Sequence, residues 1–145
     1  MSEPRAQPLT RDHFRHFLSL TTRWMDNDVY GHLNNVVYYS LFDTVVNRTL
    51  IERGVLDPQA SDVIGLVVHT QCHYFAPLAF PQEVQAGVRV AHMGQSSVRY
   101  ALGLFAADAP LSAAHGEFVH VYVDRITRRP VPLPAPLRAA LQSLH

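Results

Sequence analysis

A helical run that is apolar over most of its circumference constrains this chain more than any other feature. In residues 35–53, Val37, Leu41 and Val45 recur at intervals of four. The apolar stripe that they start is widened by Phe42, Val46 and Leu50. Gly54 follows at a position that commonly ends a helix. Because such a helix has too much apolar surface to lie on the outside of a protein, other elements must wrap it.

Five segments have the alternating or continuously apolar character of β-strands, and they can supply this cover. One precedes the helix at 17–25, and four follow it at 63–75, 83–90, 97–105 and 113–123. The turn sequence Met-Gly-Gln-Ser joins two of them into a predicted hairpin. Since no helix-sized pattern separates the last four strands, we expect a mostly antiparallel sheet. The sequence therefore predicts an α+β fold, with a five-stranded curled antiparallel sheet wrapped around one long central helix.

The two ends of the chain are expected to add little to this core, which we place at about residues 17–134. Residues 1–13 are polar and contain proline, which is typical of a loose lead-in. The tail from Pro136 predicts a short amphipathic helix or a frayed end, with one apolar face made of Leu137, Ala140, Leu141 and Leu144. The chain has no repeat or linker, so we expect a single domain over residues 1–145.

Composition excludes several classes of partner. Lysine and arginine total 12, as do aspartate and glutamate, so no overall charge draws the chain to nucleic acid or to a membrane surface. No segment resembles a signal peptide or approaches the roughly 20 apolar residues of a membrane span. The single Cys72 excludes an internal disulfide and fits a reducing compartment. We expect a cytoplasmic protein, and its low charge suggests a surface covered by another subunit.

Nine histidines suggest a metal site, but their spacing argues against one. His69 and His73 would share a strand face roughly 13 Å apart, at about 3.3 Å per residue. His115 and His120 would fall on opposite faces of their strand. The chain has neither a C-x-x-C nor an H-E-x-x-H pattern. We therefore predict no metal site and interpret these histidines as packed side chains, some of them at a subunit interface.

The loop before the helix carries the residue types that carbonyl chemistry needs. Asp26 and Asp28 are followed by Gly31 and His32, and two asparagines at 34–35 open the helix. A carboxylate there lies beside the unpaired N–H groups of a helix N-terminus, which stabilise an anion or a polarised carbonyl oxygen. Such a site can attack a carbonyl and hold the resulting charge. The ordinary alternative for a D-x-D loop is two solvated turn aspartates and an asparagine N-cap.

The pattern R-W-x-D-x-D-x-x-G-H-x-N-N at residues 23–35, followed by an aromatic-rich helix, resembles the hotdog-fold acyl-CoA thioesterases of the 4-hydroxybenzoyl-CoA thioesterase type. The resemblance covers roughly residues 18–134. It includes the ending FVHVYVDRITRRPVPLP, where Asp124, Thr127 and Arg129 follow the last strand. It implies the hotdog fold, and a homodimer or homotetramer with active sites at the dimer interface.

The resemblance carries the catalytic carboxylate onto Asp28, and from their places in the motif we predict that His32 and Asn35 act beside it. It implies that Asp28 either attacks the thioester carbonyl or activates a water molecule, and the sequence does not choose between them. Backbone N–H groups around Asn34 and Asn35 would polarise the carbonyl. His32 would orient the carboxylate or contact the thioester, and Asp26 would hold the turn. No metal or organic cofactor is implied.

Substrate binding is expected to involve the same loop and the start of the helix, through Tyr30, Gly31, Asn34 and Tyr38. The chain has no G-x-S-x-G elbow and no glycine-rich phosphate loop. Recognition of coenzyme A must then come from basic surface groups, and the candidates are Arg89, Arg99, Arg125, Arg128 and Arg129.

The sequence thus predicts an acyl-CoA thioesterase that releases a free carboxylic acid and the thiol of coenzyme A. Two alternatives stay open. One is a dehydratase or hydratase that acts on an acyl thioester, although its usual signal is a catalytic histidine in a different motif. The other is a module that binds acyl-CoA without catalysis. The acyl group and the choice between dimer and tetramer are not specified by the sequence.

Overall fold

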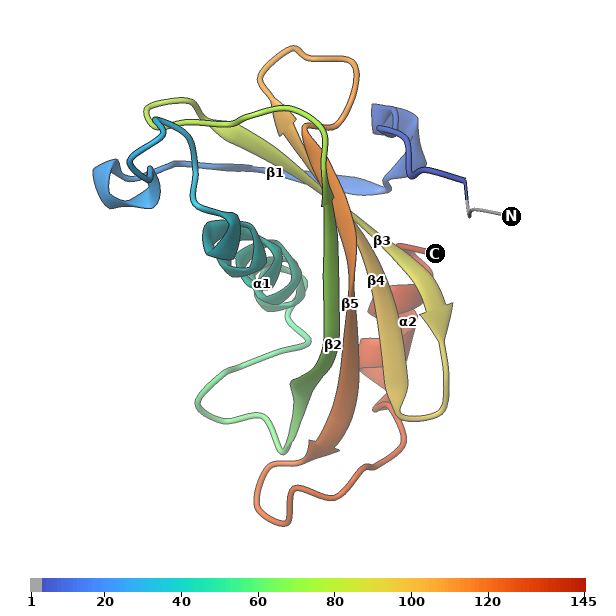
Figure 1. Ribbon diagram of the computed structural model, residues 1–145. Helices are drawn as coiled ribbons and strands as arrows, with labels where there is room; N and C mark the ends of the chain where they lie inside the picture. Colours follow the sequence, from blue (N-terminus) through green and yellow to red (C-terminus); the bar gives the residue numbers. More distant parts are fainter. Residues whose placement is uncertain (1–3) are drawn as a thin grey trace.

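The computed structural model describes residues 4–145 as one antiparallel sheet with a helix on its concave side (Figure 1). The five strands lie in the order β1-β3-β4-β5-β2. Their bounds are β1 His16–Leu20, β2 Val63–Tyr74, β3 Val84–Met93, β4 Ser97–Ala106 and β5 Ala114–Asp124. Helix α1 (Asn35–Glu52) connects β1 to β2, and α2 (Ala135–Gln142) follows β5. The predicted α+β architecture, with its curled antiparallel sheet, is confirmed.

The core lies between α1 and the concave face of the sheet. Phe42 on the helix packs edge-to-face on Phe118 of β5, with 5.7 Å between ring centroids. Alternate residues of the strands complete this layer, among them Val84, Ala86, Val88, Leu102 and Leu104. However, α1 has 18 residues and the sheet covers only one side of it. Val36, at 65% exposure, and Tyr39, at 37%, lie on its uncovered side, so the single chain does not wrap the helix as fully as predicted.

The first strand is shorter than predicted and ends at Leu20. The side chain of Asp26 accepts a hydrogen bond from the backbone N–H of Arg23 and turns residues 24–26 into a 3-10 helix. Trp24, which falls within the strand predicted at 17–25, is consequently 84% exposed. A local hydrogen bond has overridden the strand pattern.

Residues 4–13 are not a loose lead-in, and residues 1–3 lie outside the described part of the chain. The backbone of Leu9 pairs with Ser112 in the loop between β4 and β5, where Ser112 N donates to Leu9 O at 2.9 Å. Phe14 is 5% exposed and packs on the convex face over Gly103. A Cβ atom at Gly103 would collide with the Phe14 ring, so the glycine makes room for it.

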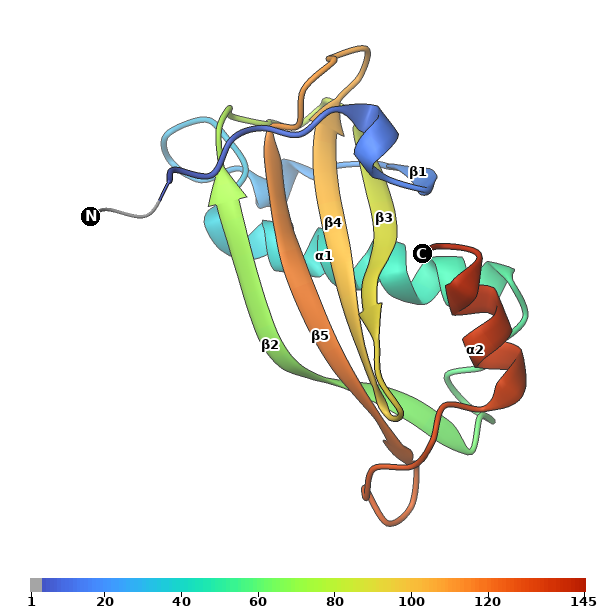
Figure 2. The same ribbon diagram turned by 90° about the vertical axis from the view of Figure 1, so that its right-hand side faces the viewer.

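The C-terminal tail is an amphipathic helix and belongs to the core, which therefore extends beyond residues 17–134. Leu137, Leu141 and Leu144 are buried. Figure 2 shows α2 beside the lower half of β3, beyond the end of the short β1. There the backbone N–H of Val90 donates to Leu144 O at 2.9 Å. The tail thus closes a sheet edge that β1 leaves open.

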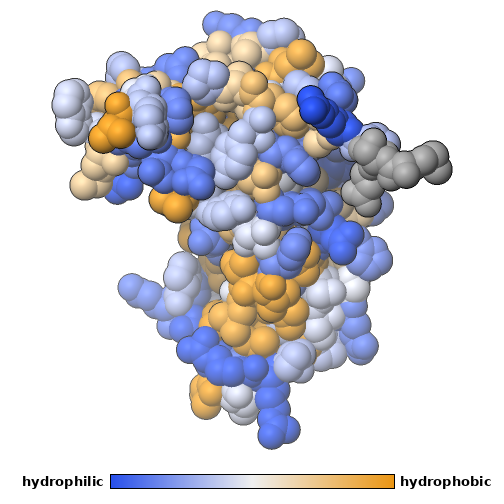
Figure 3. Space-filling model, viewed as in Figure 1, coloured by the Kyte–Doolittle hydropathy of each residue, from blue (hydrophilic) through white to orange (hydrophobic). Residues whose placement is uncertain are grey.

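Strand β2 forms the other edge of the sheet and carries exposed apolar residues at its centre. Leu66, Val67 and Val68 are 37%, 45% and 61% exposed. Figure 3 shows an apolar patch on this face of the molecule. Among residues 4–145, no helix is long and apolar enough to cross a membrane.

Candidate active site

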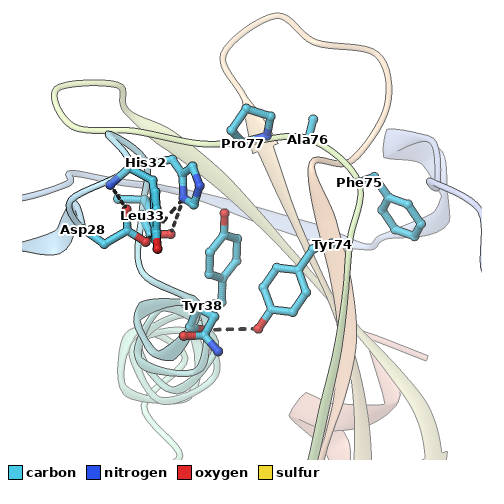
Figure 4. Close-up of a pocket in the computed structure, with 10 residues that line it drawn as sticks. Asp28, His32, Leu33, Tyr38, Tyr74, Phe75, Ala76 and Pro77 are labelled. Atoms are coloured by element: carbon cyan, nitrogen blue, oxygen red, sulfur yellow. Dashed lines mark hydrogen bonds and ion pairs between the residues drawn. The ribbon is translucent and has the colours of Figure 1, made fainter.

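A cavity of about 590 Å³ opens at the N-terminal end of α1. Three segments border it: the loop that carries Asp26 and Asp28, called the acidic loop below, the first turn of α1, and the chain that leaves β2 (Figure 4). It is lined by Asp28, Tyr30, His32, Leu33, Asn35, Tyr38, Tyr74, Phe75, Ala76 and Pro77. The cavity is therefore mostly apolar, and the carboxylate of Asp28, the imidazole of His32 and the start of α1 lie at its wall.

Asp28 is held by its own loop. Its Oδ1 accepts a hydrogen bond from Tyr30 N at 2.8 Å, and its backbone N–H donates to His32 O at 2.9 Å. The other carboxylate oxygen, Oδ2, lies 3.7 Å from Nδ1 of His32. Gly31, with φ of +85°, makes the reversal that brings His32 back over the carboxylate. One oxygen of Asp28 is thus fixed, while the other lies beside the imidazole.

Asp26 has a different environment, although it is only two residues away. It is 3% exposed, and its carboxylate accepts hydrogen bonds from Arg23 N, Nε and Nη2 at 2.8, 3.1 and 2.9 Å. Asp26 therefore stabilises the turn, which is the role that the sequence predicted for it.

The N–H groups at the start of α1 are not equally available. Asn34 is the N-cap, and its Oδ1 accepts from Val36 N at 3.1 Å. The N–H of Asn34 itself donates to Asp26 O at 2.9 Å. Within residues 4–145, the N–H of Asn35 makes no hydrogen bond. Of the two amides predicted to polarise a carbonyl, only that of Asn35 is free to do so, and Asn35 lines the cavity.

Two tyrosines extend toward each other across the cavity from α1 and β2 (Figure 4). The rings of Tyr38 and Tyr74 pack edge-to-face with centroids 4.8 Å apart. Burial raises the pKa of both phenols, and the nearby charge of Asp28 adds a small further increase to the pKa of Tyr38. Both therefore remain neutral over the physiological pH range and can act only as hydrogen-bonding or packing groups.

The acidic loop and the chain after β2 are tied together by the backbone. Leu33 N donates to Leu78 O at 2.7 Å, and Phe80 N donates to Asn27 Oδ1 at 2.9 Å. Leu33 and Leu78 are 1% and 0% exposed. These contacts make one wall of the cavity a fixed part of the fold.

Comparison with known proteins places this geometry in a family. The family model described as the thioesterase-like superfamily matches residues 22–141. The chain belongs to this superfamily. The expectation of an enzyme that hydrolyses thioesters is thereby confirmed at the level of the family.

Solved structures resemble this thioesterase-like protein over most of its length. The PA5185 protein from Pseudomonas aeruginosa strain PAO1 is 53% identical, with 96% of this chain and 97% of that chain covered and a TM-score of 0.94. A thioesterase from Thermus thermophilus, solved with coenzyme A and zinc, is 29% identical, with coverages of 90% and 95% and a TM-score of 0.74. A 1,4-dihydroxy-2-naphthoyl-CoA thioesterase from Synechocystis is 17% identical, covers 88% and 96%, and shares the fold with a TM-score of 0.79. No curated protein matches the chain.

The structure brings most of the predicted loop and helix residues of this thioesterase-like protein to one place. Asp28, Tyr30, His32, Asn35 and Tyr38 all line the cavity. Gly31 and Asn34 shape the loop and the helix start beside them. Sequence reasoning missed the wall at residues 74–77, which comes from a segment about forty residues further along the chain. The only signal in the sequence is the aromatic and proline-containing run that follows the strand, Tyr-Phe-Ala-Pro.

The five candidate arginines do not line this cavity. Arg89 and Arg99 alternate with core residues of β3 and β4, so they lie on the face of the sheet away from α1. Arg125, Arg128 and Arg129 follow β5 at the end of the sheet remote from Asp28 (Figure 1). Arg125 donates to the carbonyl oxygens of Ser61 and Pro58 and so holds a loop.

The histidines are distributed as their strand positions predict. His73 and His115 are cross-strand neighbours with ring centroids 5.5 Å apart, and His120 is buried on the other face. Across residues 4–145, no three histidine, cysteine, aspartate or glutamate side chains are arranged to hold a metal ion.

Proposed function

We propose that this protein is an acyl-CoA thioesterase whose catalytic carboxylate is Asp28. The observation that carries the proposal is that Asp28 lines the same cavity as Asn35, whose N–H makes no hydrogen bond within residues 4–145. A carboxylate supplies the base or nucleophile, and an N–H at a helix start stabilises the negative charge that develops on the thioester oxygen. This is the chemistry of the 4-hydroxybenzoyl-CoA thioesterase type, to which we assign the protein.

Two routes lead from this arrangement to the products. In the first, Asp28 attacks the carbonyl carbon, the coenzyme A thiolate leaves, and water hydrolyses the mixed anhydride. In the second, Asp28 takes a proton from a water molecule that attacks directly. His32, 3.7 Å from Oδ2, can orient the carboxylate in both cases. A single turnover in ¹⁸O-labelled water identifies the first route when water attacks the Asp28 carbonyl carbon of the anhydride, because the acid product then keeps an unlabelled Asp28 oxygen and the label enters Asp28.

We further propose that the working unit is a homodimer or a tetramer of such dimers, formed through the free edge of β2. An exposed strand edge with apolar side chains such as Val67 and Val68 is a surface that natural proteins usually cover. A two-fold axis would pair β2 with its copy in antiparallel fashion. Tyr74 at one end of β2 would then lie near Val63 at the other end of the copy.

The same symmetry gives the candidate arginines a role. Val63 pairs with Asp124 on β5, so the chain after β5 lies at that end of the sheet. In the dimer this chain would approach the cavity of the other protomer. Arg128 and Arg129, both exposed, are then the better candidates for the phosphates of coenzyme A. Arg125 is occupied by the loop that it holds. We retain Arg89 and Arg99 as weaker candidates, because they lie on the opposite face.

The test compares two isosteric variants of the acidic loop, Asp28→Asn and Asp26→Asn, in a thiol-release assay with a panel of short-chain, long-chain and aromatic acyl-CoAs. Asp28→Asn should lose at least roughly 1000-fold in kcat and keep its free energy of unfolding and its affinity for coenzyme A. Asp26→Asn should mainly lower the free energy of unfolding, because Arg23 loses a charged partner. An Asp28→Asn variant with near-full activity would show that another group performs the chemistry. Binding without turnover by the unmodified protein would favour the non-catalytic module.

A further inference from the structure

Tyr38 occupies a place in the cavity that the proposed chemistry does not use. It lies on the first turn of α1, is 3% exposed, and its ring stands against Tyr74 at 4.8 Å (Figure 4). Figure 4 shows the ring between Asp28 and His32 on one side and Tyr74 on the other. An acyl group that enters beside Asp28 therefore meets this ring before it reaches the core.

The region behind Tyr38 is filled by apolar side chains along the helix. Side chains at i and i+4 lie on one face of a helix, so Phe42 is the next residue behind Tyr38. Phe42 is 0% exposed and packs on Phe118 of β5. An acyl chain longer than the cavity would have to pass between α1 and β5, along this row of aromatic rings.

A second wall of the cavity is held by backbone hydrogen bonds. The acidic loop and the chain after β2 are joined by the hydrogen bonds of Leu33 to Leu78 and of Phe80 to Asn27. Buried, hydrogen-bonded backbone moves at a higher cost than a side chain, because its polar groups would lose their partners. The ring of Tyr38 is therefore displaced more easily than this wall, and it is the place where the depth of the cavity can change.

We propose that Tyr38 closes the inner end of the acyl pocket and limits the enzyme to short acyl groups, those that end before its ring. This inference rests on the proposed thioesterase function and adds a residue that determines its substrate range. A chain that is too long must displace the ring, and each methylene that does not fit in a hydrophobic pocket costs roughly 10-fold or more in kcat/KM.

The experiment measures thiol release from straight-chain acyl-CoAs from acetyl to dodecanoyl, with the full-length protein and with Tyr38→Ala. The unmodified protein should show kcat/KM values that fall steeply beyond a short chain length. Tyr38→Ala should move this fall to chains longer by about two carbons or more, and raise kcat/KM for them roughly 10-fold relative to the short substrates. Tyr38→Leu, which keeps apolar packing against Tyr74, should give a smaller shift in the same direction and serves as the reading if Tyr38→Ala does not fold.

Two controls separate the ring from other effects. Tyr39→Ala removes a ring from the next position of the helix, which is 37% exposed and does not line the cavity, and should leave the length profile in place. Tyr38→Phe keeps the ring and removes only the hydroxyl, so the chain length at which its activity falls should match that of the unmodified protein.

The possible failures are distinct. If the protein releases thiol but the folded Tyr38 variants keep the same length profile, the inference is wrong and the thioesterase function stands. The inference is equally wrong if the unmodified protein already prefers dodecanoyl-CoA. If no acyl-CoA is hydrolysed by the unmodified protein, the proposed function and the inference both fail.

Discussion

His120 should make the free energy of unfolding of this protein decrease at acidic pH, and the substitution of His120 should remove this contribution. The imidazole is 2% exposed, its Nε2 is buried without a hydrogen bond, and its ring lies among Tyr100, Phe118 and Tyr122. Because removal from water disfavours the charged imidazolium, burial lowers the pKa of His120 from 6.5 to about 4. The neighbouring tyrosines are uncharged at these pH values and cannot compensate a positive charge.

The magnitude follows from the linkage between proton binding and folding. The unfolded chain binds a proton at His120 below pH 6.5, whereas the folded chain binds it only below about pH 4. Stability is therefore complete above pH 6.5 and decreases as the pH falls through this window. At about 1.36 kcal/mol per pH unit, the loss between pH 7.5 and pH 5 is about 2 kcal/mol.

The assay is urea unfolding followed by circular dichroism at both pH values and one protein concentration, for the unmodified protein and for His120→Phe. The variant should lose about 2 kcal/mol less between the two pH values, whatever its absolute stability, since other titrating groups contribute equally to both proteins. As a control, His92→Phe removes an exposed imidazole and should keep the loss of the unmodified protein. An identical loss in His120→Phe would refute the argument, because His120 would then accept a proton without cost in the folded state.

Two further substitutions test the packing of the sheet. Gly103→Ala places a Cβ within the van der Waals radius of the Phe14 ring and should lower the free energy of unfolding by about 1–3 kcal/mol, measured by urea unfolding; an unchanged value would mean that the N-terminal segment does not dock as described. Val68→Arg puts a charge on the exposed edge of β2 and should convert the proposed dimer to a monomer in size-exclusion chromatography with light scattering, and reduce thiol release at least roughly 10-fold. A Val68→Arg protein that remains an active dimer would exclude this edge as the interface.

The sheet and helix were predictable because their patterns are local. Alternation over ten residues identifies a strand such as β4 without knowledge of its partners. The pattern failed at Trp24, where the side chain of Asp26 bonds the backbone and replaces the strand with a turn. It gave no sign that Phe14 is buried, because the space for this ring is made by glycines of two distant strands, Gly87 and Gly103.

The part of the candidate site that lies in one local motif was also predictable from the sequence. Asp28, His32 and Asn35 lie within eight residues, and one motif carries them all. Tyr74 comes from a distant strand, and only the fold brings its hydroxyl to the helix start, where it donates to Asn35 O at 3.3 Å. Arginine positions along the chain do not say which end of the sheet they occupy, so the distance of Arg128 from Asp28 needed the structure.

Asp26 holds the turn and Asp28 is the proposed catalytic carboxylate. The structure also allows a direct test of the proposed oxyanion donor, in which a backbone N–H is removed. Because Asp26 O accepts the hydrogen bond of the Asn34 N–H, the N–H of Asn35 is, within residues 4–145, the one free donor of the two predicted at the helix start. Asn35 is the first helical residue, where proline is favoured, and Asn34, with φ −61° and ψ 143°, has the extended conformation that precedes proline. Asn35→Pro should thus remove the N–H without breaking α1.

If the Asn35 amide holds the developing charge, Asn35→Pro should reduce kcat by roughly 100- to 1000-fold, with little change in KM or in the free energy of unfolding. Asn35→Ala keeps the N–H and should retain activity within about 10-fold, since no step is assigned to the asparagine side chain. Thiol release under saturating acyl-CoA, together with urea unfolding, measures both effects. Equal losses in the two variants would place the function of this position in its side chain, and the helix start would then serve Asp28 only as a rigid support.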